Sequence, residues 1–230
     1  TSAGLLVATL RNVMAIERGF ERHNIVMFNV ETYDPSFTND QRIAFYTGLL
    51  EQLRRIPGVS VASLAKRTPM DFGTERRRFS VPDMPSREGQ QGVFGNIVSP
   101  DYFGIMGIQV VRGRGFTPAD RPGVAAVAII SERAAESYFD DVDPLGRTAL
   151  LGGDELPVTI VGVVTDVRQE GVRRSAPPML YTPLTQPTES FDGSFGSPLY
   201  VTATMVTRVD PGAVVSAARQ AVRDLDPRVP

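Results

Sequence analysis

The chain has 230 residues and 42% of them are hydrophobic, which is enough for the core of one large domain or two small ones. A formal net charge of −2 and a pI near 5.5 disfavour binding to nucleic-acid phosphates. With no cysteine and a single histidine, His23, the sequence excludes disulfides, thiolate metal sites and cysteine nucleophiles, and it disfavours a zinc enzyme or a serine triad.

The chain begins with apolar residues at helical spacing in the segment TSAGLLVATLRNVMAI. No capping residue precedes them, as though a longer helix had been cut. An ordinary amphipathic first helix explains the same pattern. No run reaches the about 18 to 20 apolar residues of a membrane span. We therefore expect a helix over residues 1–20. It is either the remainder of a longer helix or an ordinary amphipathic first helix.

A strand–helix–strand unit follows. Residues 24–33 alternate as a strand does, and the segment SFTNDQRIAFYTGLLEQLRRIPG predicts a helix. Thr38 with Gln41 fits a capping box, and Pro57 with Gly58 ends the helix. The segment VSVASLAKR predicts a second strand, so the helix packs on one face of a sheet.

The middle of the chain has short apolar runs broken by glycine and proline. GVAAVAII and LPVTIVGVVTDV predict buried strands, and SERAAESYF predicts a short helix capped by Ser131. PPMLYTPL predicts a strand at a sheet edge, because proline has no N–H to donate to a second neighbour. The middle is therefore expected to be mostly β.

Near the end, PLYVTATMVTR predicts a strand and Asp210 with Pro211 begins a helix. This strand and helix resemble the first unit, so we expect both chain ends to build one lobe. The predicted fold class is α+β with two lobes: residues 21–67 and 198–230 form a split βαβ lobe of the ferredoxin-like kind, and residues 68–197 form an inserted β-rich subdomain.

The stretch SPDYFGIMGIQVVRGRGFTPAD contains four glycines and two arginines, which raises the question of phosphate binding. A dinucleotide loop needs a third glycine where this sequence has Pro118, and the lysine of a P-loop is missing. The glycines instead predict turns. Gly104 and Gly107 are expected to end a short helix, and Gly113 and Gly115 to let the chain turn after a strand.

Arg112 and Arg114 lie on one side of that strand by alternation. We expect them to grip a carboxylate, such as Asp101 or Asp120, and to pin the turn. The structural turn candidates are therefore Gly107, Arg112, Gly113, Arg114, Gly115 and Asp120.

Other acidic clusters do not predict chemistry. Asp140, Asp141 and Asp143 lack the spacing, glycine and glutamate of a calcium loop. Asp166 and Glu170 have no visible second partner for acid–base work. The sequence predicts no catalytic residue, no metal ligand and no cofactor site.

Several ordered blocks together resemble a known family. SPDYFGIMGIQVVRGRGFTPAD, VAIISERAAESYFDDVDPLGR, VTIVGVVTDVR, PPMLYTPL and RQAVRDLDP are similar to the extracytoplasmic core domain of MacB-like ABC transporter permeases, of the FtsX-like class. GLLVATLRNVMAIERGF resembles the segment that follows the first membrane helix in that family. Ser131 stands where such domains often have asparagine, and either residue caps a helix.

The resemblance implies a non-catalytic domain on the periplasmic side of the inner membrane. ATP would be hydrolysed by a cytoplasmic domain or chain, and membrane helices would transmit the motion to this domain for export or for handling a partner protein. It also implies a homodimer, a periplasmic or outer-membrane partner, a porter-type role for the lobe built from both ends, and a membrane-proximal role for residues 1–20.

Two alternatives stay open: a free-standing module that binds a small ligand, and a hydrolase that uses carboxylates alone. The split topology also has a consequence for the sheet. A final strand would lie beside residues 25–33 and would follow Asp226, so we expect residues 25–33 to form an open edge in this chain.

Overall fold

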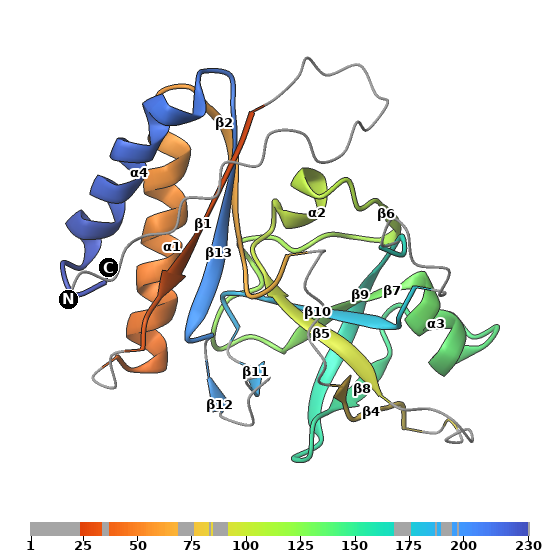
Figure 1. Cartoon of the computed structure of the whole chain (residues 1–230). Coiled ribbons are helices and arrows are strands. Elements are labelled where there is room, and N and C mark those ends of the chain that lie inside the picture. Colours follow the sequence, from red (N-terminus) through yellow and green to blue (C-terminus); the bar gives the residue numbers. More distant parts are fainter. Residues whose placement is uncertain are drawn as a thin grey trace. The chain divides into compact units, whose positions relative to one another are not determined.

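The structure is a computed structural model (Figure 1) that describes residues 24–33, 37–68, 76–82, 84, 92–167, 176–186, 188–189, 195–196 and 198–229. The chain divides into two compact units. Unit 1 comprises Thr1–Lys66 and Pro198–Pro230, and unit 2 comprises Arg67–Ser197. The helix predicted over residues 1–20 lies outside the described residues.

Unit 1 contains three strands and two helices. Its elements are β1 (Asn24–Glu31), α1 (Asn39–Arg55), β2 (Val59–Ala65), β13 (Tyr200–Thr207) and α4 (Pro211–Leu225). The strand order is β1-β13-β2, and β13 is antiparallel to both neighbours, so β1 and β2 are parallel. This is the predicted split arrangement. Among the described residues β1 has a strand on one side only, so the predicted open edge is confirmed there.

Helix α1 begins and ends where its local signals predicted. The Thr38 hydroxyl accepts the N–H of Gln41 at 3.2 Å, and the Gln41 side chain accepts the N–H of Thr38 at 2.9 Å, so the capping box is complete. After the helix, Gly58 has a φ of +92°, which lets the chain turn directly into β2. The apolar face of α1 is buried: Ile43, Tyr46, Leu50 and Leu53.

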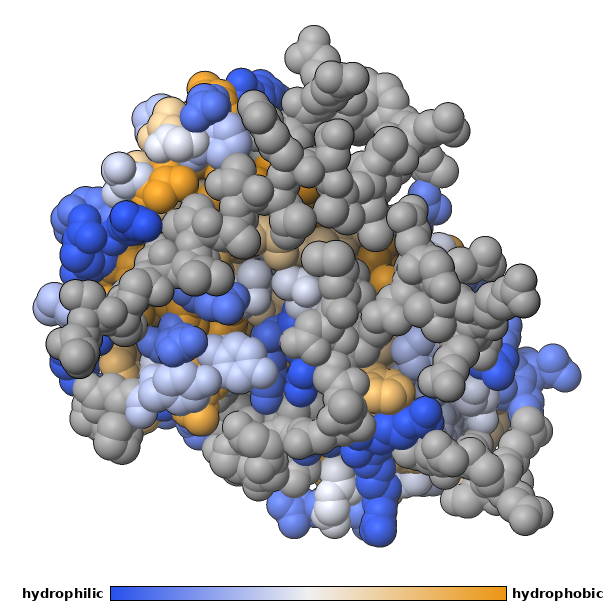
Figure 2. Space-filling view, viewed as in Figure 1, coloured by the Kyte–Doolittle hydropathy of each residue, from blue (hydrophilic) through white to orange (hydrophobic). Residues whose placement is uncertain are grey.

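Helix α4 is capped by the side chain of Asp210, which accepts the N–H of Gly212 at 2.8 Å, with Pro211 in the first turn. Its inner face buries Val214, Ala218 and Ala221. The outer face is polar, and Figure 2 shows hydrophilic residues gathered at the left edge, over the C-terminal half of α4. Both helices lie on the same side of β1, β13 and β2 (Figure 1), as the βαβ prediction requires.

Unit 2 is dominated by strands. Its elements are β3 (Arg76–Arg77), β4 (Phe79–Ser80), β5 (Val93–Val98), α2 (Tyr102–Ile105), β6 (Val110–Gly113), β7 (Val127–Ser131), α3 (Glu132–Phe139), β8 (Thr148–Leu151), β9 (Leu156–Val164), β10 (Met179–Pro183), β11 (Thr188–Glu189) and β12 (Phe195–Gly196). The strand order in its main sheet is β5-β10-β7-β9-β8-β4, with β3 paired to β5 and β6 paired to β9. Strands β11 and β12 pair separately.

The prediction that PPMLYTPL forms an edge strand is wrong. Strand β10 lies between β5, to which it is parallel, and β7, to which it is antiparallel, and all five of its residues are buried. The prolines do not interfere because they stand at the ends of the strand. The carbonyl of Pro178 accepts the N–H of Phe94 at 2.9 Å, and Pro183 is the last residue of β10. The residues between them keep their N–H groups for both neighbours.

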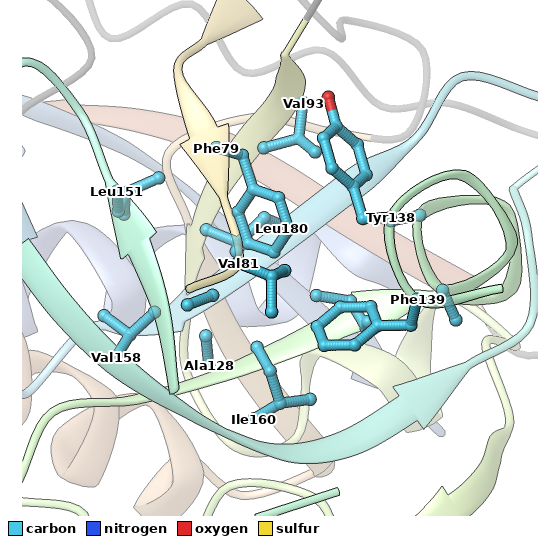
Figure 3. Packing of buried hydrophobic residues seen from close by; sticks show 14 of the residues in the cluster. Phe79, Val81, Val93, Ala128, Tyr138, Phe139, Leu151, Val158, Ile160 and Leu180 are labelled. Atoms are coloured by element: carbon cyan, nitrogen blue, oxygen red, sulfur yellow. The ribbon is translucent and has the colours of Figure 1, made fainter. Parts of the chain in front are cut away.

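Helix α3 is capped by Ser131, as predicted, and packs on the core of unit 2. The Ser131 hydroxyl accepts the N–H of Ala134 at 3.2 Å. Phe79 then packs edge-to-face on Tyr138 with ring centroids 4.8 Å apart (Figure 3). Small and branched residues from β7, β9 and β10 belong to the same cluster: Ala128, Ile130, Val158, Ile160, Val163 and Leu180.

The observed fold is α+β, as predicted. Among the described residues, four helices accompany a much larger number of strands. None of these helices combines the length and the apolar character needed to cross a bilayer.

Candidate functional site

The glycine-rich stretch forms a helix end rather than a phosphate cradle. Gly107 has a φ of +67° and follows α2. Its N–H bonds the carbonyl of Gly104 at 3.3 Å, and the N–H of Ile108 bonds the carbonyl of Phe103 at 2.8 Å, which together form a Schellman motif. Gly104 lies inside α2, so Gly107 alone ends this helix.

Gly113 is required where β6 approaches β9. Its φ is +71°, and a Cβ atom there would lie 2.3 Å from the carbonyl oxygen of Val161. From the other strand, a Cβ on Gly162 would lie 2.3 Å from the carbonyl oxygen of Arg114. The two backbones therefore pack without side chains between them. Gly115 has an ordinary φ, and its carbonyl accepts a hydrogen bond from Arg114 at 3.0 Å.

Arg114 and Asp120 form a two-pronged ion pair. Nη1 and Nη2 of Arg114 each donate to one carboxylate oxygen of Asp120 at 2.8 Å. Thr117 adds its backbone N–H at 2.8 Å and its hydroxyl at 3.3 Å to the same carboxylate. These donors hold the pKa of the Asp120 carboxyl below its ordinary value, with Arg114 as the largest cause. Asp120 is buried, whereas the Arg114 side chain is 45% exposed.

The loop that follows Asp120 is tied down by two residues from the end of β10. Thr185 donates its hydroxyl to the carbonyl of Asp120. The Gln186 amide donates to the carbonyls of Arg121 at 3.3 Å and Ala125 at 3.1 Å, and it accepts the N–H at the start of β7 at 3.0 Å. The loop is thus held at both ends by polar groups, of which Gln186 is buried.

Arg112 does not join Arg114 on Asp120. It lies 3.6 Å from a carboxylate oxygen of Asp143, and both side chains are about half exposed or more, at 47% and 66%. An exposed pair at this distance contributes little. Of the two arginines, Arg114 meets Asp120, one of the carboxylates expected from the sequence, and Arg112 lies near Asp143 instead.

The other acidic residues have structural contacts. Asp143 accepts the N–H of Leu145 at 3.1 Å within its own turn. Asp166 accepts the N–H of Arg133 at 2.9 Å and so caps α3 alongside Ser131. Glu170 lies outside the described residues. Within the described part of the chain, no three His, Asp or Glu side chains come together as a metal site.

Sequence reasoning missed two buried polar clusters. In unit 2 the side-chain amide of Asn96 bonds both backbone groups of Arg67, at 3.0 and 2.9 Å, and donates to the Tyr102 hydroxyl at 3.2 Å. In unit 1, the Thr32 hydroxyl lies 2.9 Å from the Tyr46 hydroxyl and accepts a hydrogen bond from Nε of Arg42 at 3.0 Å. The signal available in the sequence was a polar residue at a position that the periodicity of its helix or strand places on the buried face. Arg42, for example, stands one helical turn before Tyr46 on the apolar face of α1.

The described site is therefore a rigid turn, and its chemistry is that of hydrogen bonds between the protein's own groups. Solved structures share this fold. The periplasmic region of MacB from Actinobacillus actinomycetemcomitans aligns with a TM-score of 0.55 and 14% identity, covering 86% of this chain and 83% of that one. The extracellular domain of the ABC-type transporter YknZ from Gram-positive bacteria gives 0.53 and 21%, covering 89% and 94%.

Curated relatives match over shorter segments. The macrolide export protein MacB 2 of Aeromonas hydrophila is 37% identical over 79 residues, which is 34% of this chain and 12% of that protein. The pyoverdine export protein PvdT of Pseudomonas syringae pv. tomato is 36% identical over 93 residues, which is 36% of this chain and 14% of that protein. This chain thus spans less than a fifth of these relatives. The profile of the MacB-like periplasmic core domain matches residues 2–225, and the chain belongs to that family.

Proposed function

We propose that this chain is the periplasmic domain of an ABC transporter permease of the inner membrane, and that it couples cytoplasmic ATP hydrolysis to substrate export or to the handling of a partner protein. The observation that carries the proposal is the family match over residues 2–225. The curated relatives are named for export of macrolides and of pyoverdine, which makes export of a small molecule the first candidate.

In this proposal the domain itself does no chemistry. Arg114 donates to Asp120, and Asp120 also accepts the N–H of Thr117, so both charged residues of the turn bond groups of the domain itself. ATP would bind to a cytoplasmic ATPase, and the permease would work as a homodimer with a periplasmic or outer-membrane partner. Residues 21–67 and 198–230 would form the porter-type lobe, and residues 68–197 the inserted subdomain.

Hydrogen exchange on the full-length permease, assembled with its ATPase in lipid nanodiscs, tests this proposal. ATP with vanadate should change the exchange rates of amides in this domain, although the nucleotide binds elsewhere. The separately expressed domain should bind neither ATP nor Zn²⁺ in calorimetry. Amide exchange rates that do not change with ATP and vanadate, or micromolar binding of ATP or Zn²⁺ to the domain alone, would contradict the proposal.

A further inference from the structure

Strand β6 carries an apolar patch on the surface of unit 2. All four of its residues are exposed, although the strand pairs with β9 (Figure 1). Val110 is 39% and Val111 is 43% exposed, and they are two of the five large hydrophobic residues that are exposed in the described part of the chain. The register against β9 shifts by one residue between Val110 and Arg112, so Val111 is the extra residue of a β-bulge. The bulge interrupts the alternation of side chains, and both valines remain outside the core.

The patch is held in a fixed position by the residues at both ends of β6. Before the valines, the N–H of Gln109 donates to the hydroxyl of Thr165 at 3.1 Å, and the N–H of Thr165 donates to the carbonyl of Gln109 at 2.9 Å. After them, the N–H of Arg114 donates to the carbonyl of Val161 at 3.0 Å. A surface that is already ordered loses little entropy when it binds, so the two valines are well prepared for a contact.

The bulge also indicates how a partner would meet β6. In the described part of the chain β6 has a strand on one side only, and such an edge could accept an added strand. A β-bulge disturbs the regular spacing of N–H and C=O groups that an added strand needs, and natural proteins use bulges to protect sheet edges. A partner of β6 is therefore expected to pack on its side chains rather than to extend the sheet.

Two opposite charges border the valines. Arg112 follows them directly, and one of its nitrogens lies 3.6 Å from a carboxylate oxygen of Asp143. This distance is long, whereas Arg114 and Asp120 share two bonds of 2.8 Å. A loose exposed pair contributes little within one chain, so it can exchange its partner at little cost. The surface thus offers apolar side chains beside one positive and one negative group, which makes it complementary to a second copy of itself.

Building on the homodimer of the proposed function, we propose that β6 is a contact between two copies of this domain in the permease. A two-fold axis relates the copies, and Val110 and Val111 pack against the same strand of the second copy. Arg112 of each copy pairs with Asp143 of the partner subunit, and the two-fold axis makes this pairing reciprocal. The valines exclude water from the two ion pairs, which strengthens each pair beyond its value on the free surface.

Cross-linking of the full-length permease, assembled with its ATPase in lipid nanodiscs, tests the position of the contact. This domain has no cysteine, so Val110→Cys or Val111→Cys introduces a single thiol into it, and cysteines elsewhere in the complex are replaced by serine. A short bis-maleimide should join two copies at either position. Val209→Cys is the matched control, because Val209 is also 39% exposed but lies in unit 1, and it should give only background cross-linking.

Charge reversal tests the pairing itself. Arg112→Asp or Asp143→Arg, each combined with Val110→Cys, places like charges across the interface and should lower cross-linking roughly tenfold. Co-expression of the two variants should restore cross-linking in mixed dimers, because each reversed charge then faces an opposite charge on the partner subunit. Within each copy the two residues still carry like charges, so a pair that acts only within one chain predicts no recovery.

An exposed ion pair on α3 provides the control for the charge reversals. Arg133 and Glu136 lie 3.2 Å apart and are 46% and 67% exposed, almost the same as Arg112 and Asp143 at 47% and 66%. Arg133→Glu and Glu136→Arg, each combined with Val110→Cys, should leave cross-linking unchanged. All four reversals affect exposed pairs, so the melting temperatures of the variants should be similar.

The outcomes separate the contact from the function on which it rests. If native mass spectrometry finds one copy of the permease in each complex, the proposed homodimer fails and the contact fails with it. If two copies are present but Val110→Cys and Val111→Cys cross-link no better than Val209→Cys, only the contact is refuted. Mixed dimers that do not recover, or an equal loss in the α3 variants, also refute it. Cross-linking at β6 that is lost in each reversal and recovered in the mixed dimers supports it.

Discussion

Removing Arg114 should destabilise unit 2 measurably, whereas removing Arg112 should not. Arg114→Ala deletes two charge-assisted hydrogen bonds of 2.8 Å to the buried carboxylate of Asp120. A hydrogen bond to a charged group contributes about 1.5–3 kcal/mol to the free energy of unfolding. Asp120 keeps its bonds from Thr117, and the Arg114 side chain is 45% exposed, so solvent screening reduces the loss. We expect a loss of about 1–2 kcal/mol.

Urea unfolding at pH 7, followed by circular dichroism, measures this difference. For a chain of this size the corresponding fall in Tm is roughly 2–8 °C. The control is Arg112→Ala, which deletes an exposed pair with 3.6 Å between its charged atoms and should cost less than about 0.5 kcal/mol.

The pH dependence gives a second check. Because the folded-state pKa of Asp120 is lowered, its contribution is present above the ordinary carboxyl pKa and is lost as the pH falls through the folded value. The difference between the unmodified domain and Arg114→Ala should therefore shrink below about pH 4. Equal losses for Arg112→Ala and Arg114→Ala at pH 7 would refute the assignment of the stabilising contact to the Arg114–Asp120 pair.

Three further predictions concern the backbone. Gly113→Ala should cost roughly 3 kcal/mol or more in urea unfolding, since a Cβ there meets a carbonyl of β9, whereas Gly146→Ala has a similar φ in open space and should cost about 1; equal costs would contradict the close approach. Ser131→Ala should cost about 2 kcal/mol in the same assay, because it removes a helix cap and leaves the buried N–H of Met179 unpaired; a loss below 0.5 would count against this role. The backbone N–H groups of even-numbered residues in β1 point toward β13, as that of Thr32 does. The N–H groups of odd-numbered residues from Ile25 to Glu31 point away from β13 and should exchange faster by NMR; equal protection would reveal a second neighbouring strand.

Local signals were sufficient to locate most elements. The capping box at Thr38, the Asp210 cap with Pro211 and the Ser131 cap each depend on residues within three positions of one another, so the sequence displays the whole interaction. The alternation in β1 and β13 is equally local, because one face of each strand packs on the helices. The order of the three strands in unit 1 then followed from the parallel βαβ connection.

Interactions between distant residues could not be read in this way. The central position of β10 depends on β5 and β7, which come much earlier in the chain, and its prolines gave a misleading local signal. Gln186 fixes the loop after Asp120 from about sixty positions away. The Arg114–Asp120 pair was within reach because the two residues are six positions apart on a tight turn.

The split construction of unit 1 sets the order in which the chain can fold. Strands β1 and β2 never pair with each other, since β13 lies between them and supplies the hydrogen bonds to both. During synthesis, β1 therefore has no strand among the described residues to pair with until residues 200–207 emerge, after all of unit 2. Pairings of such high sequence separation form slowly, and exposed apolar strands are prone to aggregate in the meantime. Unit 2 is continuous in sequence and can complete its sheet first, so folding is expected to proceed from the inserted segment outward.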